Sequence, residues 1–378
     1  MVWEELLIHG VGIACVVLIY LRLRHLSRFD VMYWAYTRTP IGKIFHGKQI
    51  AVSHAKPTHS NGELHDCGSF SVLEVPLLSD NWCYMLVDHE SASVAAVDPC
   101  DAERVIDELK ALTRRWRAMH GRDLVLRAVL TTHKHLDHAG GNDALAAHFG
   151  ATLRVVGARD ELVQACNHPL DDGDVFTLGA TTVTGLLTPC HTPGHMCFLI
   201  ESKGRNQAPA LFTGDTLFVG GCGRFFEGNA EQMQHNLGTT IASLPGSCRL
   251  FCGHEYTLDN LQFASWLEPS NKHISAKLRW AEAQRQQGKS TMPSTVEEEL
   301  KINPFMRCTQ DEVASAVQHA WSTFSPHDSA PLKHRDTEES TLLSASQIMH
   351  RLRALKDNNA HNKPETSGRS INKEKRHE

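Results

Sequence analysis

The stretch THKHLDHAGG, residues 132–141, places three histidines and one aspartate at H-x-H-x-D-H spacing. Neutral imidazole and carboxylate groups are the ligands that proteins use for Zn²⁺, Fe and Mn. The apolar run at 123–130 predicts a buried strand, so these side chains follow a strand end. We expect Gly140 and Gly141 to let the backbone turn sharply into the next helix. The candidate ligands are His133, His135, Asp137 and His138.

Composition limits the other function classes. The 378 residues allow a large core and more than one domain, and 24 histidines mean that a single histidine carries little weight. A net charge of −5 gives no electrostatic case for a nucleic-acid partner. The 11 cysteines form no C-x-x-C pair, which favours reduced thiols over a disulfide framework.

An apolar run near the N-terminus, LLIHGVGIACVVLIYL at 6–21, predicts a membrane helix. It is slightly shorter than the ~20 residues of a bilayer span, and snorkelling of Arg22 and Arg24 would extend it. Acidic Glu4 and Glu5 precede the run and basic residues follow it, the reverse of a cleaved signal peptide.

The same charge asymmetry predicts an orientation, because positively charged flanks stay in the cytosol. We predict a single-pass membrane anchor at 1–28, with the catalytic domain facing the cytosol, and a polar connector at 29–69. A buried helix of a soluble protein is the alternative. A mitochondrial presequence fits less well, because the run is not amphipathic.

Regular structure is predicted from residue 70 onward. Short apolar runs predict strands at 70–76, 82–87 and 93–97, then helices at 101–116 and 142–149 on either side of the motif. Further strands at 181–187, 210–212 and 249–252 are each followed by a candidate ligand: His191, Asp215 and His254. Because loops at one end of a sheet converge in a layered α/β fold, we expect all these ligands to form one site.

The composition changes after this domain, which we place at 70–256. Helical patterns at 258–266, 271–287, 297–300, 311–324 and 341–357 predict an all-helical lobe over 257–357, with a polar linker at 325–340. Residues 358–378 are polar and without periodicity, as is typical of a disordered tail.

Longer motifs carry a family resemblance. TPCHTPGH (188–195), FTGDTLFVGGCGRFFEG (212–228), CGHEYTLDNLQFA (252–264) and NPFMR (303–307) resemble glyoxalase II, the hydroxyacylglutathione hydrolases of the metallo-β-lactamase fold. The resemblance implies an α/β fold, an αββα sandwich followed by a C-terminal helical lobe that binds substrate. YTRTPIG (36–42) behind an apolar run is similar to a membrane-anchored member of that family. Two positions depart from the family pattern: Leu136 replaces an aromatic residue and Phe226 replaces a tyrosine.

The resemblance also implies how the site works. His133, His135 and His191 would bind one metal ion, Asp137, His138 and His254 another, and Asp215 would bridge them. The cofactors are then two divalent ions, zinc foremost, with iron or manganese as alternatives. The implied catalytic set is Asp215 together with Asp98 and His195, which orient ligand imidazoles. The implied substrate-binding positions are Arg224, Phe226, Tyr256, Arg353 and Lys356.

The implied reaction is hydrolysis of S-(2-hydroxyacyl)glutathione, such as S-lactoylglutathione, to a 2-hydroxy acid and glutathione through a dinuclear metal-bound hydroxide. No G-x-S-x-G motif is present, and we interpret Cys190 and Cys252 as buried packing residues. Two alternatives stay open. One is a mononuclear-iron sulfur dioxygenase of the same fold, a class that generally lacks the helical lobe. The other is a membrane-tethered regulatory protein with weak hydrolase activity.

Overall fold

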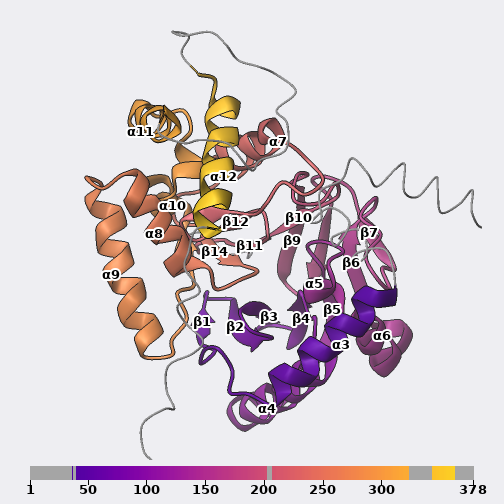
Figure 1. The fold of residues 1–378 in the computed structure, drawn as a ribbon. Coiled ribbons are helices and arrows are strands. Elements are labelled where there is room, and N and C mark those ends of the chain that lie inside the picture. The colour runs from indigo at the N-terminus through magenta and orange to yellow at the C-terminus, as the bar shows by residue number, and fades with distance from the viewer. Residues whose placement is uncertain (1–35, 37–39, 202–206, 323–342, 362–378) are drawn as a thin grey trace, which may run out of the picture. The chain divides into compact units, whose positions relative to one another are not determined.

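A computed structural model describes residues 36, 40–201, 207–322 and 343–361 (Figure 1). The chain divides into two compact units, Met1–Lys56 with Pro326–Thr337, and Pro57–Ser325 with Glu338–Glu378. In the first unit the described backbone forms helix α3 (Pro40–His54). The predicted connector at 29–69 is therefore partly regular structure, since it contains α3 and the first strand of the second unit.

The membrane prediction falls on residues 1–28, which lie outside the described residues. Within the described ranges, no helix combines the length and the apolar character that crossing a membrane requires.

Two large sheets form the centre of the second unit. The seven-stranded sheet has the order β1-β2-β3-β4-β5-β6-β7. Its strands are β1 (Leu64–Asp66), β2 (Phe70–Leu77), β3 (Asn81–Asp88), β4 (Ser93–Val97), β5 (Val125–Leu130), β6 (Arg154–Ala158) and β7 (His168–Leu170). The six-stranded sheet has the order β15-β14-β11-β10-β9-β8. Its strands are β8 (Val175–Leu178), β9 (Thr181–Leu187), β10 (Met196–Glu201), β11 (Ala210–Gly214), β14 (Arg249–Cys252) and β15 (Ser294–Thr295).

The central strands β2, β3, β4 and β11 are buried on both faces, which explains why they are continuous apolar runs, whereas the edge strand β8 alternates between buried and exposed residues. In β3, Trp82 and Tyr84 point into a core shared with the second sheet, where Phe212 and Phe251 meet them. Cys83 and its alternate neighbours point the other way, into a core under the helices α4 (Ala102–His120) and α6 (Asn142–Phe149). A third core lies on the outer face of the second sheet, under α7 (Ala230–His235), α11 (Asp311–Ser322) and α12 (Ala345–His361). The layers are therefore α, β, β and α (Figure 1).

The strand directions bring the predicted ligand loops to one place. Strands β4, β5 and β6 are parallel, and so are β11 and β14 in the other sheet. The motif at 132–141 follows β5 and forms the short helix α5 (Leu136–Ala139). Gly140 and Gly141 form the turn between α5 and α6, but both have right-handed helical backbone angles, so the turn itself does not require glycine. Gly141 is instead needed for a close approach, because an added Cβ would lie 2.1 Å from the Pro99 carbonyl oxygen.

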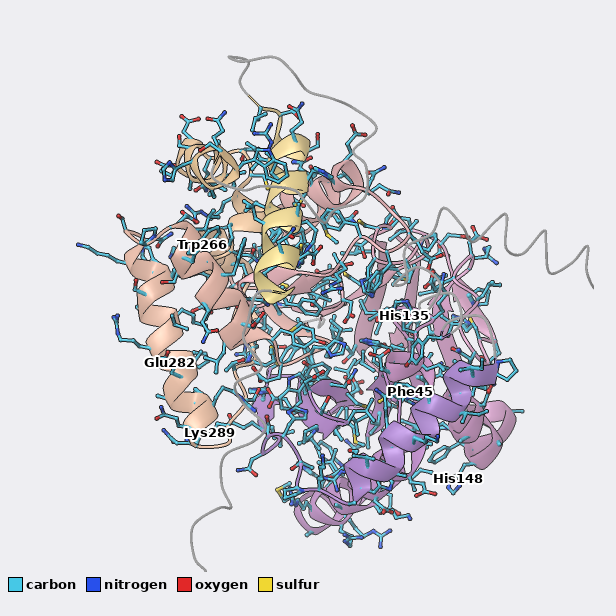
Figure 2. The ribbon with its side chains drawn as sticks, in the orientation of Figure 1. Phe45, His135, His148, Trp266, Glu282 and Lys289 are labelled. Atoms are coloured by element: carbon cyan, nitrogen blue, oxygen red, sulfur yellow. The ribbon has the colours of Figure 1, made fainter. Side chains whose placement is uncertain are left out.

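The C-terminal part contains the predicted helices, with one difference. Its helices are α8 (Thr257–Leu267), α9 (Lys272–Gln286), α10 (Val296–Ile302), the 3₁₀ turn η3 (Pro304–Arg307), α11 and α12. The prediction of an all-helical lobe is wrong for β15, which pairs with β14 and extends the second sheet. Helix α12 runs beyond the predicted helix end at 357, so the predicted tail begins later, and residues 362–378 and the linker at 325–340 lie outside the described residues. Trp266 on α8 and Glu282 on α9 are exposed on the surface of this part of the fold (Figure 2).

Candidate functional site

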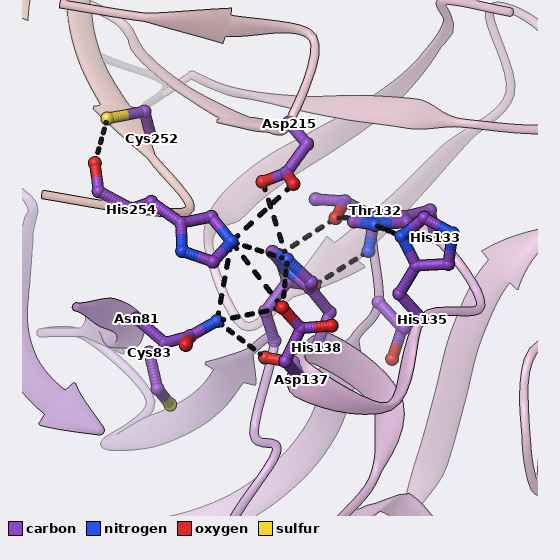
Figure 3. A network of polar contacts seen from close by, with 12 residues as sticks. Asn81, Cys83, Thr132, His133, His135, Asp137, His138, Asp215, Cys252 and His254 are labelled. Atoms are coloured by element: carbon purple, nitrogen blue, oxygen red, sulfur yellow. Dashed lines mark hydrogen bonds and ion pairs between the residues drawn. The ribbon is translucent and has the colours of Figure 1, made fainter. Parts of the chain in front are cut away.

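Four loops meet and bring the predicted metal ligands together (Figure 3). One follows β5, and the others follow β9, β11 and β14. Three groups of side chains could each hold a metal ion, because within each group the ligand atoms all lie within 4.8 Å of one another. The groups are His133 with His135 and His191, His133 with His138 and Asp215, and Asp137 with His138 and His254. The seven residues that the sequence indicated therefore form one cluster.

Asp215 is central to this cluster. Its Oδ2 lies 3.4 Å from Nε2 of His191, and its Oδ1 lies 3.4 Å from Nε2 of His138. His138 in turn lies 3.3 Å from Nε2 of His254, and Asp137 Oδ2 lies 3.6 Å from the same nitrogen. The Asp215 carboxylate thus lies close both to His191 and to His138, which belong to different ligand groups. This is the position expected of a bridging ligand.

The donor set fits a divalent metal centre. Nδ1 of His135 lies 2.8 Å from Nε2 of His133 and 3.2 Å from Nε2 of His191. Nitrogen lone pairs this close repel one another unless a proton or a cation lies between them. In the described part of the chain, the buried Oδ1 of Asp215 makes no hydrogen bond, and a bound cation would account for an unpaired oxygen at this position. Imidazole and carboxylate ligands suit zinc, iron and manganese.

The histidines differ in their electrostatic surroundings. Burial, reinforced by neighbouring imidazoles, holds the pKa values of His133 and His135 well below their usual range, so both rings are neutral, as metal ligands must be. Burial acts in the same direction on His138, but the charges of Asp215 and Asp98 outweigh it and raise the pKa of that ring well above its usual value. Protons and metal ions therefore compete for His138.

Asp98 lies directly behind these ligands. Its Oδ2 accepts a hydrogen bond from Nδ1 of His138 at 3.0 Å, and its Oδ1 accepts one from the backbone N–H of Thr132 at 2.8 Å. The hydrogen bond from Nδ1 of His138 fixes the tautomer of that ring and turns its Nε2 toward the cluster. Asp98 has a φ of 50° at the end of β4, a left-handed conformation that costs a non-glycine residue about 1–3 kcal/mol. Such a conformation persists where surrounding contacts impose it, as the two hydrogen bonds do here.

The hydrogen bonds of His195 go to groups other than the ligand imidazoles. Its Nε2 accepts a hydrogen bond from the backbone N–H of Asp215 at 3.1 Å, while its Nδ1 faces the hydroxyls of Thr188 and Thr216. The ring also stacks on that of His133, with 5.0 Å between the centroids, so the predicted orientation of ligand imidazoles stays a prediction. The turn at Gly214, with a φ of 46°, brings the Asp215 backbone onto the ring. His195 therefore positions the Asp215 carboxylate through the main chain.

Three site residues are absent from the sequence-based set. Asp80 accepts a hydrogen bond from Nδ1 of His254 at 2.7 Å, and the Asn81 amide donates to the carbonyl of Asp137 at 3.0 Å. The buried Glu161 accepts backbone N–H groups from two different ligand loops. Asp80 ends the β2–β3 turn and Asn81 is the first residue of β3, so their position at a strand end was an available signal. Glu161 follows β6, a strand that the sequence analysis did not predict.

Aromatic rings flank the ligands on both sides. The ring of Phe226 lies 4.9 Å from that of His191, centroid to centroid. Tyr256 stacks on His254 at 4.7 Å with an interplanar angle of 8°, and 38% of its surface is exposed. The predicted substrate position Arg224 is part of the same loop as Phe226, and its side chain is partly exposed. These three positions border the cluster.

The two basic positions of α12 are buried in contacts with the protein itself. Arg353 Nη1 donates to the carbonyl of Cys222 at 3.0 Å, and Lys356 Nζ donates to the Asp259 carboxylate at 2.8 Å. Burial, with the charge of Arg353, lowers the pKa of Lys356 to about 7. Their predicted contact with substrate stays a prediction, and their structural contacts dock α12 onto the domain.

The cysteines beside the ligands are packing residues. All cysteines in the described ranges are free, and both Cys190 and Cys252 are buried. Burial raises the pKa of Cys190 to about 12, so its thiol stays protonated and is a poor nucleophile.

Comparison with known proteins agrees with this geometry. Residues 111–254 match the metallo-beta-lactamase superfamily, and residues 255–359 match the hydroxyacylglutathione hydrolase C-terminus. The cytoplasmic hydroxyacylglutathione hydrolase of Arabidopsis thaliana is 45% identical over 243 residues, which are 64% of this chain and 90% of the relative. Hydroxyacylglutathione hydrolase-like proteins of Gallus gallus and Mus musculus are 43% and 42% identical, each over 63% of this chain and 80% of the relative. Matches of this identity and coverage, together with the His and Asp cluster, show that the chain belongs to the hydroxyacylglutathione hydrolase family of the metallo-β-lactamase superfamily and is an enzyme of the thiolester hydrolase class.

Proposed function

We propose that this enzyme hydrolyses S-(2-hydroxyacyl)glutathione, such as S-lactoylglutathione, with two divalent metal ions, zinc foremost. The observation that carries the proposal is the overlap of the three ligand groups, which leaves Asp215 between a three-histidine end and an end with Asp137, His138 and His254. When bound, such ions supply hydroxide at neutral pH and polarise the thioester carbonyl. The shared carboxylate disfavours the mononuclear-iron alternative.

The chain's own residues then hold and shield the reacting groups. Asp98 and Asp80 fix the ring orientations of His138 and His254, so the ligand nitrogens need not reorganise during turnover. Phe226 and Tyr256 supply apolar surface beside the ligands and limit the access of bulk water. The guanidinium of Arg224, which pairs with Asp357 at 3.4 Å and is partly exposed, is suited to a carboxylate of glutathione.

Hydrolysis of S-lactoylglutathione by the purified full chain, with metal analysis of the same sample, tests the proposal. We expect about two ions per chain and loss of activity on removal of the metal. His133→Ala and Asp215→Asn should reduce turnover to background while the far-ultraviolet circular dichroism stays that of the wild type. Activity that survives in a metal-stripped sample would refute the mechanism.

We also propose that residues 1–28 anchor the enzyme to a membrane with the catalytic domain in the cytosol. The apolar run at 6–21 and the basic residues after it support this proposal. The full chain, expressed in cells, should resist extraction by alkaline carbonate, and a chain lacking 1–28 should not. In sealed membrane vesicles whose outer face is the cytosolic one, added protease should digest the catalytic domain. Extraction of both chains alike would overturn the anchor.

A further inference from the structure

An ion pair joins two of the loops that surround the ligand cluster. Nζ of Lys134 lies 2.7 Å from Oε1 of Glu227, and each side chain is only 16% exposed. Lys134 stands between two ligands of the first motif, His133 and His135. Glu227 follows Phe226 in the segment between β13 (Gly221–Cys222) and α7. The pair therefore connects a metal-binding loop to a loop that lines the site.

The backbone of Lys134 is fixed by a third segment. Oε1 of Glu161 accepts the Lys134 N–H at 3.0 Å, and the Gln164 amide donates to the Lys134 carbonyl at 3.3 Å. The other oxygen of Glu161 accepts the N–H of Gly194, in the loop of His191, at 2.7 Å. A Cβ on Gly194 would lie 2.8 Å from that oxygen, so the two groups are packed tightly. Lys134 thus presents its ammonium group from a fixed position.

The loop of Glu227 also contacts the ligand loops through residues on either side of the ion pair. Its Arg224 carbonyl accepts a hydrogen bond from Nδ1 of His191 at 3.0 Å, and the Phe226 ring packs against the same imidazole. Both contacts lie at or before Phe226. After it, the Lys134 ion pair joins Glu227 to the first motif, and the Cys190 thiol donates to the Asn229 carbonyl at 3.2 Å. The ring of Phe226 is therefore held between two attachments to the ligand loops.

We propose that the Lys134–Glu227 ion pair positions the loop of Arg224 and Phe226 over the three-histidine end of the cluster, and so sets the affinity of the enzyme for its thioester. The proposal deepens the proposed function and rests on it for its kinetic part. A partly buried pair is screened less than an exposed one, and its fixed lysine backbone reduces the entropy lost on pairing. Because neither side chain is a proposed metal ligand, the effect should fall on KM rather than on metal content.

The test compares Lys134→Ala, Glu227→Ala, the double substitution and the charge exchange Lys134→Glu with Glu227→Lys, all in the full chain. Each single substitution should raise KM for S-lactoylglutathione about tenfold and leave kcat within about twofold. The double substitution should be no worse than either single one, and the charge exchange should recover most of the loss. Lys301→Ala, which breaks the exposed Lys301–Glu297 pair, is the matched control and should change none of these values.

Two further measurements keep the positioning role separate from the reaction. Amide hydrogen exchange at 223–228 should be faster in the single variants and return toward the wild-type rate in the charge exchange, whether or not the substrate is correct. Metal content should stay unchanged. If the wild-type protein has no thioesterase activity, the proposed function is refuted. The rates of amide hydrogen exchange at 223–228 still test the positioning role in that case. Unchanged exchange in the single variants, loss of metal, or no recovery in the charge exchange would overturn the inference.

Discussion

Asp80 accepts a hydrogen bond from Nδ1 of His254 at 2.7 Å, which leaves Nε2 of that ring facing the metal cluster. Asp98 holds His138 in the same way at 3.0 Å. His191 instead donates its Nδ1 proton to a backbone carbonyl. A carboxylate partner makes an imidazole a more basic ligand, so the two ends of the cluster differ electronically although both contain histidine.

Asp80→Ala should weaken metal binding at the end that contains Asp137, His138 and His254. We expect the affinity there to fall about 10- to 100-fold, because the His254 ring loses the partner that orients it. Burial lowers the pKa of His254, but Asp215 and Asp80 outweigh burial and raise it to about 10. Metal binding there must displace a proton, so affinity should rise with pH. Zinc titration against a competing chelator measures both effects.

Asp80→Asn is the control for this prediction, since the amide oxygen still accepts the hydrogen bond but carries no charge. Its metal affinity should lie between those of the wild type and Asp80→Ala. Equal weakening of both metal positions would contradict the assignment of Asp80 to one end of the cluster.

The metal ligands could be predicted from the sequence because each one follows an apolar run within a few residues. The strands at 93–97, 181–187 and 249–252 have the bounds that the sequence predicted. The loops after 181–187 and 249–252 converge because both strands belong to the six-stranded sheet and end at the same edge, while 93–97 belongs to the sheet packed against it. Local pattern and general topology were sufficient for this part of the site.

Other features depend on contacts that no local pattern contains. A polar turn with Asp160 and Glu161 is ordinarily solvated, and Glu161 is buried only because two ligand loops close over it. The pair of residues that forms β15 is too short to show periodicity and becomes a strand by pairing with β14. The basic side chains of α12 match a substrate-binding pattern in sequence, yet their partners lie about a hundred residues away in the chain.

Glu161→Ala should loosen the three-histidine end of the cluster. Removal of the carboxylate leaves the N–H groups of Lys134 and Gly194 without their acceptor and frees the two ligand loops from each other. We expect about a tenfold loss of metal affinity, measured by chelator competition. Asp160→Ala, at the exposed neighbouring position, should leave affinity unchanged. Equal effects of the two substitutions would show that Glu161 does not hold the loops.

Arg353→Ala should lower the stability of the fold more than it lowers the affinity for substrate. The buried carbonyl of Cys222 would lose its donor, which typically costs about 1–3 kcal/mol in the free energy of unfolding. Arg351→Ala on the same helix removes a cation near the Trp321 ring and should cost less. Denaturant unfolding of both variants measures the difference. Unchanged stability with a raised KM would show instead that the guanidinium serves the substrate.

Glu299 provides a prediction about pH. This buried carboxyl on α10 accepts hydrogen bonds from Ser294, from the Gly220 N–H at 2.8 Å and from the Asn303 amide at 2.9 Å. Burial raises its pKa from 4.5 to about 7 in spite of these donors. The folded state therefore holds a proton that the unfolded state releases between about pH 4.5 and pH 7.

The sign of the effect follows from that proton. The contribution of Glu299 to stability is largest below pH 4.5, falls as the pH rises toward about 7, and changes no further above it. The difference in unfolding free energy between the wild type and Glu299→Gln should shift by about 3 kcal/mol across this window, in favour of the variant at higher pH. Denaturant unfolding of both proteins at a series of pH values measures it. Glu297→Gln, at an exposed position of the same helix, should follow the wild-type profile closely. A difference between wild type and Glu299→Gln that is flat with pH would show that the carboxyl is already ionised in the fold.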